Sequence, residues 1–246
     1  MMSTRLFVSA PLGNGKLIEL TGEQARYLGR VLRARAGETL ALFNGDDGEW
    51  QATILRITKS AVELEVGEHI PRDSESELKM HLVQGISRGE RMDFVVQKAT
   101  ELGVKRVTPV FTDYGVVKLD DKRAAKRLEH WQRIGISASE QCGRIRPPLI
   151  DPPIALNRWF GDAHAGDSTQ LVLHPNANSP FCDAGPPTSK LCLLIGPEGG
   201  FSDREFDDAS VAGFQPVSLG PRILRTETAA VAVLAVAQSL WGDLNA

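Results

Sequence analysis

Cysteine is scarce in this sequence, and its spacing excludes two classes of protein. The 246 residues contain three cysteines, Cys142, Cys182 and Cys192, and no C-x-x-C pair. An odd number of cysteines without such spacing predicts neither a disulfide framework nor a zinc site. We therefore expect reduced cysteines without a functional role and a protein that binds no metal.

Long apolar runs are also missing. The longest, residues 229–237, has nine residues, whereas a membrane-spanning helix needs about 20. The first eight residues lack the apolar segment and the cleavage site of a secretory signal. These absences predict a cytoplasmic protein without a membrane span. With 42% hydrophobic and 24% charged residues, the chain can bury a core without disulfides.

The chain as a whole has no large excess of positive or negative charge, but some of its segments do. The formal net charge is −3. Residues 1–72 hold nine basic and nine acidic side chains, residues 73–150 hold 14 and 11, and residues 151–246 hold five and 11. An acidic last third therefore masks a basic middle third, and the net charge does not exclude a nucleic-acid partner.

The first 72 residues have the pattern of a small β-rich domain. Apolar runs and alternation predict strands at residues 40–43, 50–57 and 61–66. Residues 21–36 follow a helical period that places Arg26, Arg30 and Arg33 on one face. The polar sequence after Pro71 is the best candidate for a linker, so we expect a domain boundary at residues 72 and 73.

After this boundary, predicted strands and helices alternate, which indicates an α/β domain with a mostly parallel sheet. The predicted strands cover residues 79–86, 107–111, 171–174, 191–195 and 216–219. The predicted helices cover residues 90–102, 122–142 and 227–240. Two proline-rich segments are expected to be loops, at residues 147–153 and 176–187.

A glycine-rich segment follows the predicted strand at 191–195. From Ile195 to Gly200 it reads Ile-Gly-Pro-Glu-Gly-Gly, and glycine lets backbone N–H groups approach a ligand because it has no Cβ atom. Ser202 and Glu205 have the spacing of a capping box that starts a helix. A tight turn without a ligand fits the pattern equally well. The segment matches neither a P-loop nor the dinucleotide fingerprint, which favours a ligand without phosphate groups.

A second segment of the same design lies between Leu219 and Thr226. A predicted strand ends at a Gly-Pro pair, and Thr226 is expected to cap the next helix, with Glu227 in its first turn. Arg222 and Arg225 are two of only five basic residues in the last 96. We favour a functional role for them over a solvated one. The two segments are expected to form walls of one pocket.

A third segment, residues 137–147, ends a predicted helix in a basic loop that contains Arg144. Together with Lys98 and other basic residues of the middle third, it forms a candidate surface for RNA phosphates. For the basic residues at 122–127, a solvated helix face is the favoured interpretation. For Arg144, a functional role is favoured.

These segments closely resemble the ribosomal RNA small subunit methyltransferase E family, which comprises uridine-N3 methyltransferases of the SPOUT superfamily. The similarity covers nearly the whole chain and is specific, because six motifs occur in order over about 225 residues. The motifs are Arg5-Leu6-Phe7; Val31-Leu32-Arg33 with Gly37; Gln97-Lys98-Ala99-Thr100-Glu101-Leu102-Gly103 with Pro109; Glu140-Gln141 with Arg144 and Pro147; Ile195-Gly196-Pro197-Glu198-Gly199-Gly200-Phe201; and Leu219-Gly220 with Ile223-Leu224-Arg225-Thr226-Glu227-Thr228-Ala229.

The resemblance implies a fold and an assembly. Residues 1–72 are expected to form a PUA-like β-barrel that helps to hold RNA. Residues 73–246 are expected to form a SPOUT methyltransferase domain, of α/β class with a mostly parallel sheet and a deep trefoil knot. Knots are very rare, so sequence rules alone favour an unknotted sheet. A homodimer is also implied.

The resemblance further implies S-adenosylmethionine-dependent methylation of N3 of a specific uridine in 16S ribosomal RNA, within the small ribosomal subunit. The residues expected around the cofactor are Leu173, His174, Ile195, Gly196, Pro197, Glu198, Gly199, Gly200, Leu219, Gly220, Ile223, Leu224, Arg225, Thr226 and Thr228. Those expected to contact RNA are Arg5, Arg30, Arg33, Lys98 and Arg144.

The chemistry assigns candidate catalytic roles. Loss of the N3 proton spreads negative charge onto the uracil carbonyl oxygens, and Arg225 or Arg144 is the kind of donor that stabilises it. Glu198 and Glu227 are candidates for the general base, and an anchoring role in the loops is at least as good an interpretation.

The chain departs from the family pattern at two places, and two other functions compete with methyl transfer. The family often has a histidine at the position of Tyr27 and a basic-Ser pair at that of Tyr114-Gly115, which affects individual RNA contacts and not the reaction. A non-catalytic RNA-binding or ribosome-assembly protein is one alternative, against which the intact loop motifs argue. A nucleotide-dependent oxidoreductase ranks lower, because the dinucleotide fingerprint is absent.

Overall fold

The computed structural model describes residues 4–117, 119–161 and 168–245, and the chain divides into two compact units. The N-terminal unit contains Met1–Glu75 together with Ser139–Pro147, and the α/β unit contains Ser76–Ala138 and Pro148–Ala246. The sequence boundary at residues 72 and 73 does not anticipate that a segment near residue 140 belongs to the first unit.

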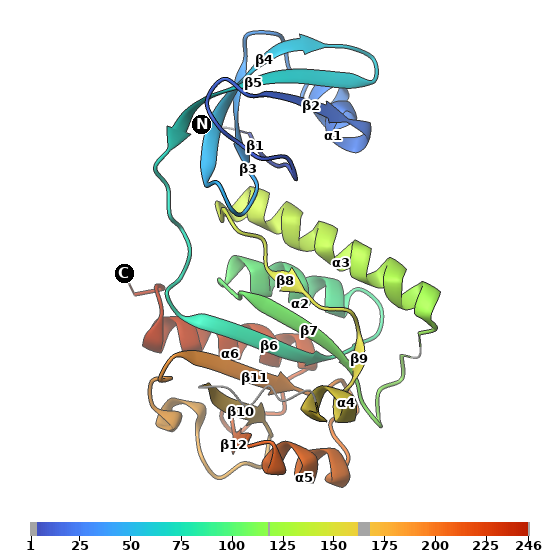
Figure 1. The fold of residues 1–246 in the computed structure, drawn as a ribbon. Coiled ribbons are helices and arrows are strands. Elements are labelled where there is room, and N and C mark those ends of the chain that lie inside the picture. The colour runs from blue at the N-terminus through green and yellow to red at the C-terminus, as the bar shows by residue number, and fades with distance from the viewer. Residues whose placement is uncertain (1–3, 118, 162–167, 246) are drawn as a thin grey trace. The chain divides into compact units, whose positions relative to one another are not determined.

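The N-terminal unit is built on a five-stranded sheet in the order β1-β3-β4-β5-β2 (Figure 1). The strands are β1 (Arg5–Phe7), β2 (Leu17–Thr21), β3 (Thr39–Phe43), β4 (Glu49–Ile57) and β5 (Ala61–Ile70). Only β1 and β3 pair in parallel. The three strands predicted from the sequence are confirmed as β3, β4 and β5, whereas β1 and β2 were not predicted.

The helix predicted over residues 21–36 is shorter than expected. Helix α1 (Gly22–Arg26) continues into a π-helical turn, η1 (Tyr27–Val31), and Arg33 adopts a left-handed backbone with φ of 53°. A non-glycine residue in this region cannot continue a right-handed helix. The prediction that Arg26, Arg30 and Arg33 share one helix face is therefore wrong for Arg33.

The α/β unit contains a parallel sheet in the order β12-β10-β11-β6-β7-β8, with β9 also paired to β7 (Figure 1). Its strands are β6 (Lys79–Gly85), β7 (Arg106–Phe111), β8 (Leu149–Ile150), β9 (Ile154–Ala155), β10 (Thr169–Leu173), β11 (Lys190–Ile195) and β12 (Gln215–Val217). Every strand pair in it is parallel. The predicted parallel sheet is confirmed, and β8 corrects the expectation that residues 147–153 form only a loop.

Helices pack on both faces of this sheet because strand side chains alternate between the faces. Leu193 of β11 shares a core with α2 (Arg91–Glu101), α3 (Asp121–Cys142) and α6 (Thr226–Trp241). Its neighbour Leu194 belongs to a separate core with α4 (Leu156–Gly161) and α5 (Asp203–Val211). A short 3₁₀ helix, η2 (Phe181–Ala184), lies in the second predicted loop.

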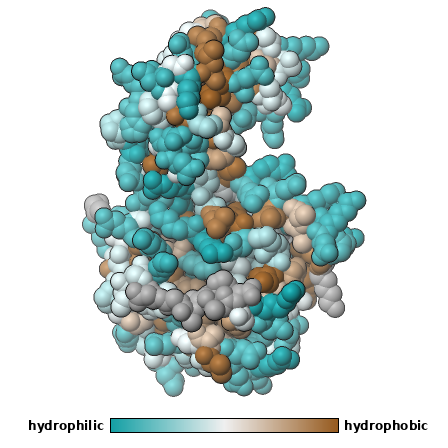
Figure 2. Space-filling model, in the orientation of Figure 1, coloured by the Kyte–Doolittle hydropathy of each residue, from teal (hydrophilic) through white to brown (hydrophobic). Residues whose placement is uncertain are grey.

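Apolar side chains are mostly inside the protein, and one of the cysteines is buried with them. Figure 2 shows hydrophilic side chains over most of the viewed face, with hydrophobic ones in small groups. No helix within the described ranges is both long enough and apolar enough to cross a membrane. Cys192 is buried in the sheet, and burial raises the pKa of its thiol to about 12. This thiol is therefore neutral and unreactive at physiological pH.

Candidate functional site

A cavity of about 990 Å³ lies in the α/β unit where three strands end. The loops that follow β10, β11 and β12 form its walls, and the start of α6 contributes a further side. Parallel strands bring their carboxyl ends to one edge of the sheet, which is where ligands of open α/β sheets bind. The fold therefore joins the two glycine-containing segments at one cavity, as their sequences predicted.

Close backbone packing explains the glycines of the first wall. Gly200 has a left-handed φ of 71° and donates its N–H to the carbonyl oxygen of Pro197 at 2.9 Å, which closes the turn. A Cβ atom on Gly85, at the end of β6, would lie 2.5 Å from the ring of Pro197. Any larger residue at position 85 would push the turn out of place.

A capping box fixes the end of the first wall, as the sequence predicted. The Ser202 hydroxyl accepts the Glu205 N–H at 3.3 Å, and the Glu205 carboxylate accepts the Ser202 N–H at 2.9 Å. The same groups bind the loop after β7, because Glu205 accepts the Asp113 N–H and the Ser202 hydroxyl donates to the Asp113 carboxylate. The start of α5 and the β7 loop are therefore held together.

Buried hydrogen bonds connect the second wall to the first. The Thr226 hydroxyl donates to the carbonyl oxygen of Gly196 at 2.7 Å and accepts from the amide of Gln84, which is fully buried, at 2.9 Å. The expectation that Thr226 caps α6 is wrong: Arg225 is the N-cap residue, and Thr226 is the first helical residue. The Thr226 side chain instead links the start of α6 to the glycine-rich turn.

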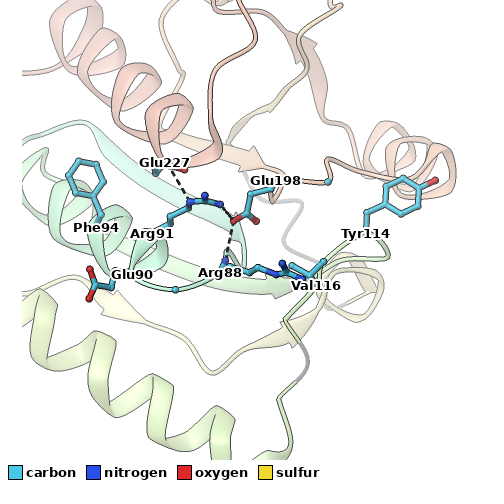
Figure 3. Close-up of a pocket in the computed structure, with 10 residues that line it drawn as sticks. Arg88, Glu90, Arg91, Phe94, Tyr114, Val116, Glu198 and Glu227 are labelled. Atoms are coloured by element: carbon cyan, nitrogen blue, oxygen red, sulfur yellow. Dashed lines mark hydrogen bonds and ion pairs between the residues drawn. The ribbon is translucent and has the colours of Figure 1, made fainter.

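Arg91 links the same two walls by charge. Its guanidinium donates to the Glu198 carboxylate and lies 3.7 Å from that of Glu227 (Figure 3). Burial raises the pKa of Glu198, but its hydrogen bonds to backbone N–H groups and its pairing with Arg91 outweigh that effect, and the pKa is lowered overall. Glu198 is therefore a charged anchor of the loop and a poor proton acceptor.

Two arginines at the cavity have no such partner. Arg222 and Arg225 are exposed and line the cavity, and neither forms an ion pair or side-chain hydrogen bond with any residue in the described ranges. Their guanidinium groups are available to a ligand, since each presents several unsatisfied donors.

The structure brings nearly all of the residues expected around the cofactor to this one cavity. Those that line it are Leu173, His174, Ile195, Gly196, Pro197, Glu198, Gly199, Gly200, Leu219, Gly220, Ile223, Leu224, Arg225 and Thr226. Thr228 does not line it, because it lies on the exposed side of α6.

Arg5 and Arg144 lie elsewhere, in the interior of the N-terminal unit. Arg5 is 9% exposed and forms a two-pronged ion pair with Glu49, while donating to the carbonyl oxygens of Ser139 and Arg144. Arg144 is 3% exposed and pairs with Glu75 at 2.9 Å. Their burial does not fit the RNA contacts expected of both or the catalytic role expected of Arg144. These side chains instead hold residues 139–147 to β1 and to Glu75 within the N-terminal unit.

The other three residues expected to contact RNA are placed differently. Arg30 and Arg33 are exposed in the N-terminal unit. Lys98, on α2, forms a salt bridge with Glu101 at 2.8 Å. Arg30 and Arg33 are therefore open to an RNA phosphate, whereas Lys98 would first have to leave Glu101.

Two residues of the site gave no sequence signal. Arg91 and Gln84 precede their partners Glu198 and Thr226 by 107 and 142 positions, so no local pattern reveals the contacts. Gln84 lies near the end of β6, and Arg91 is the first residue of α2. This position between a strand and the next helix is the one indication in the sequence that they belong to a site.

Comparison with known proteins agrees with this architecture. The family model described as an RNA methyltransferase domain matches residues 74–238, and an RNA methyltransferase PUA domain matches residues 20–67. Ribosomal RNA small subunit methyltransferase E of Buchnera aphidicola subsp. Acyrthosiphon pisum is 33% identical over 98% of this chain and 95% of its own length.

Solved structures give the same result. The Neisseria gonorrhoeae ribosomal RNA small subunit methyltransferase E bound to S-adenosyl methionine is 39% identical and has a TM-score of 0.92, with 99% of this chain and 100% of that chain covered. A Legionella pneumophila protein in complex with the cofactor SAM is 42% identical, with a TM-score of 0.94 and coverage of 99% and 100%. The chain belongs to the ribosomal RNA small subunit methyltransferase E family.

Proposed function

We propose that this protein transfers a methyl group from S-adenosylmethionine to N3 of a specific uridine in 16S ribosomal RNA. The observation that carries the proposal is the cavity whose two loop walls are linked by Thr226 and Gly196, in a chain of this family. Relatives with 39% and 42% identity hold the cofactor in their structures.

The chemistry of the cavity fits this cofactor. Its volume of about 990 Å³ is at the upper end of the usual range for small-molecule sites. Leu173, Ile195 and Leu219 supply apolar surface for an adenine ring, and Asp203 and Asp207 supply negative charge near a cationic ligand. The glycine-rich turn leaves the backbone open to polar groups of the ligand.

The chain's own residues would act mainly by orientation and charge. When bound, S-adenosylmethionine supplies an electrophilic sulfonium methyl group. Arg225, exposed at the start of α6 and without an ion pair among the residues that the structure describes, is placed to donate to a uracil carbonyl oxygen on which negative charge develops as N3 loses its proton. Glu198 keeps its charge and holds Arg91, which positions the walls of the cavity. We assign the N3 proton to solvent and not to Glu198.

Binding of the RNA would be shared between the units. We assign residues 1–72 to RNA holding and residues 73–246 to catalysis, with Arg30 and Arg33 as phosphate contacts. The resemblance also supports a homodimer, a trefoil knot in the α/β unit, a substrate within the small ribosomal subunit and a cytoplasmic location. These four properties stay predictions.

One experiment tests the reaction directly. The protein is incubated with small ribosomal subunits from a strain that lacks its gene, in the presence of S-adenosylmethionine labelled in the methyl group, and the modified base is mapped. We expect label on N3 of a single uracil, and none on subunits from a strain that retains the gene. Label on another base would overturn the proposed specificity. Cofactor binding in calorimetry without any label would favour a non-catalytic RNA-binding protein.

A further inference from the structure

A second cavity of about 920 Å³ adjoins the first in the α/β unit. The two cavities share Arg91, Glu198 and Gly199, so they meet at the glycine-rich turn. The second is otherwise lined by residues that precede or begin α2, by the loop after β7 and by Glu227 of α6. Because the second cavity adjoins the first, a molecule bound in the second would lie next to a ligand in the first and could react with it.

Two exposed aromatic side chains stand in this cavity. Phe94 is 44% exposed and Tyr114 is 56% exposed, and Figure 3 shows them at opposite ends with Arg88, Arg91 and Glu198 between them. Exposed aromatic rings are platforms on which unpaired bases stack. The two rings come from different elements, Phe94 from α2 and Tyr114 from the loop after β7, so each can stack a different nucleotide of one strand.

The loop that carries Tyr114 is held in place. The preceding residue, Asp113, is bound by the capping box of α5 through Ser202 and Glu205. A Cβ atom on Gly199 would lie 2.8 Å from the carbonyl oxygen of Tyr114, so the turn and this loop are in close contact. The ring is therefore exposed on a fixed backbone, which lowers the entropic cost of binding.

The two arginines that line the cavity differ in their partners among the described residues. Arg91 is committed to Glu198 and Glu227. Arg88 is exposed, and its guanidinium has no ion pair or hydrogen bond with any residue of the described chain. Figure 3 shows this guanidinium directed toward the Tyr114 end, whereas the Glu90 carboxylate lies toward the Phe94 end. An anionic group would therefore bind between the rings, at Arg88.

We propose that this second cavity binds single-stranded RNA beside the cofactor, with bases stacked on Phe94 and Tyr114 and the phosphate between them held by Arg88. The inference rests on the proposed methyl transfer, because it assigns the acceptor strand to that reaction. It places the target nucleotide at the shared wall of Glu198 and Gly199, where the two cavities meet.

The test compares Tyr114→Ala, Phe94→Ala and Arg88→Ala with the ring-retaining variant Tyr114→Phe. Small ribosomal subunits that lack the modification are the RNA probe, and calorimetry measures S-adenosylmethionine affinity separately. We expect each alanine variant to raise the KM for subunits by about tenfold or more, from the loss of one stacking or phosphate contact. Tyr114→Phe should restore most of the affinity, and the cofactor Kd should change less than about twofold in all variants.

Arg158→Ala is the matched control, because Arg158 is exposed on α4, which packs on the other face of the sheet. It should leave the KM for subunits unchanged. Unchanged KM values for Tyr114→Ala and Arg88→Ala in an enzyme whose wild type methylates would overturn the RNA site alone. A wild type that methylates no subunit would instead refute the proposed function. Light scattering adds a third outcome: conversion of a dimer to a monomer by Phe94→Ala, without an RNA defect, would assign this surface to a second copy of the chain.

Discussion

Arginines in the two units differ in what surrounds their guanidinium groups. In the N-terminal unit, Arg5 and Arg144 are buried against Glu49 and Glu75. In the α/β unit, Arg225 stands exposed at a cavity and has no carboxylate partner among the described residues. Both kinds belong to the motifs on which the resemblance to the family is based, so a motif arginine is not by itself evidence of a ligand contact.

The difference lies in how each side chain's charge is balanced. A buried arginine must be neutralised and fully hydrogen-bonded, because an unpaired charge in the protein interior is very costly. Arg5 meets this demand with four bonded groups from two other segments of the chain, Glu49 and residues 139–144, which makes it a structural link. An exposed arginine next to a cavity keeps its donors for a ligand. Mutations should therefore affect stability in the first case and turnover in the second.

The largest expected effect is on stability, from Arg144→Ala. The substitution leaves the Glu75 carboxylate buried without its cation, which should lower the free energy of unfolding by about 3–5 kcal/mol. Chemical denaturation measures this loss. Arg146→Ala is the control two residues away, because Arg146 is exposed and its side chain donates one hydrogen bond, to the carbonyl oxygen of Gly45 at 3.0 Å, whose loss should cost less than about 1.5 kcal/mol. Equal effects of the two substitutions would refute the structural role of Arg144.

Arg225→Ala should show the opposite behaviour. Loss of one donor to a developing negative charge lowers kcat by about 10²–10³-fold in comparable sites. The melting temperature should stay within about 2 °C of the wild type, since an exposed side chain without a partner contributes little to stability. Single-turnover methylation at saturating cofactor measures the chemical step. Unchanged turnover with normal cofactor affinity would remove Arg225 from the reaction.

Local patterns were sufficient to predict most elements of the fold. Apolar periodicity placed a helix at residues 90–102 and a strand at 191–195, and the structure has them at Arg91–Glu101 and Lys190–Ile195. The strands β1 and β8 have three and two residues and form only by pairing with distant strands, so no periodicity could reveal them. The early end of α1 was missed because the apolar pattern continues after the backbone leaves the helix.

In the site too, features that depend on neighbouring residues were predicted, and contacts between distant residues were not. The glycine-rich turn and the capping box at Ser202 were found because glycine and capping chemistry act over a few residues. The partners of Arg91, Gln84 and Arg144 are 69 to 142 residues away, so charge and residue type could not show which of these side chains is neutralised inside the fold. The structure was needed to separate buried arginines from available ones.

In the α/β unit, Glu198 differs from Arg225 because it lines the cavity and has an ion-pair partner, Arg91. The variant Glu198→Gln tests whether this carboxylate is an anchor or a catalytic base. The pKa of Glu198 is lowered, so its carboxylate contributes to stability above its unfolded-state pKa and loses this contribution only as the pH falls through the folded-state pKa. At neutral pH it is already fully charged. We expect kcat to fall less than about tenfold and the shape of its pH profile between about pH 6 and 9 to persist. With the profile extended to lower pH, a fall in kcat on the acidic side that the wild type shows and the variant lacks would make Glu198 the general base.

The smallest expected effect tests the exception in the N-terminal unit, where Arg30 and Arg33 are exposed. If both contact phosphates, the double variant Arg30→Ala/Arg33→Ala should weaken subunit binding and reduce the slope of log K against log salt by about one unit per lost contact. The cofactor affinity and the free energy of unfolding should not change, because neither side chain is buried. Lys98→Ala is the comparison, since the salt bridge to Glu101 already neutralises that ammonium group and its loss should alter the slope less. An equal slope in the double variant and the wild type would leave the N-terminal unit without an assigned phosphate contact.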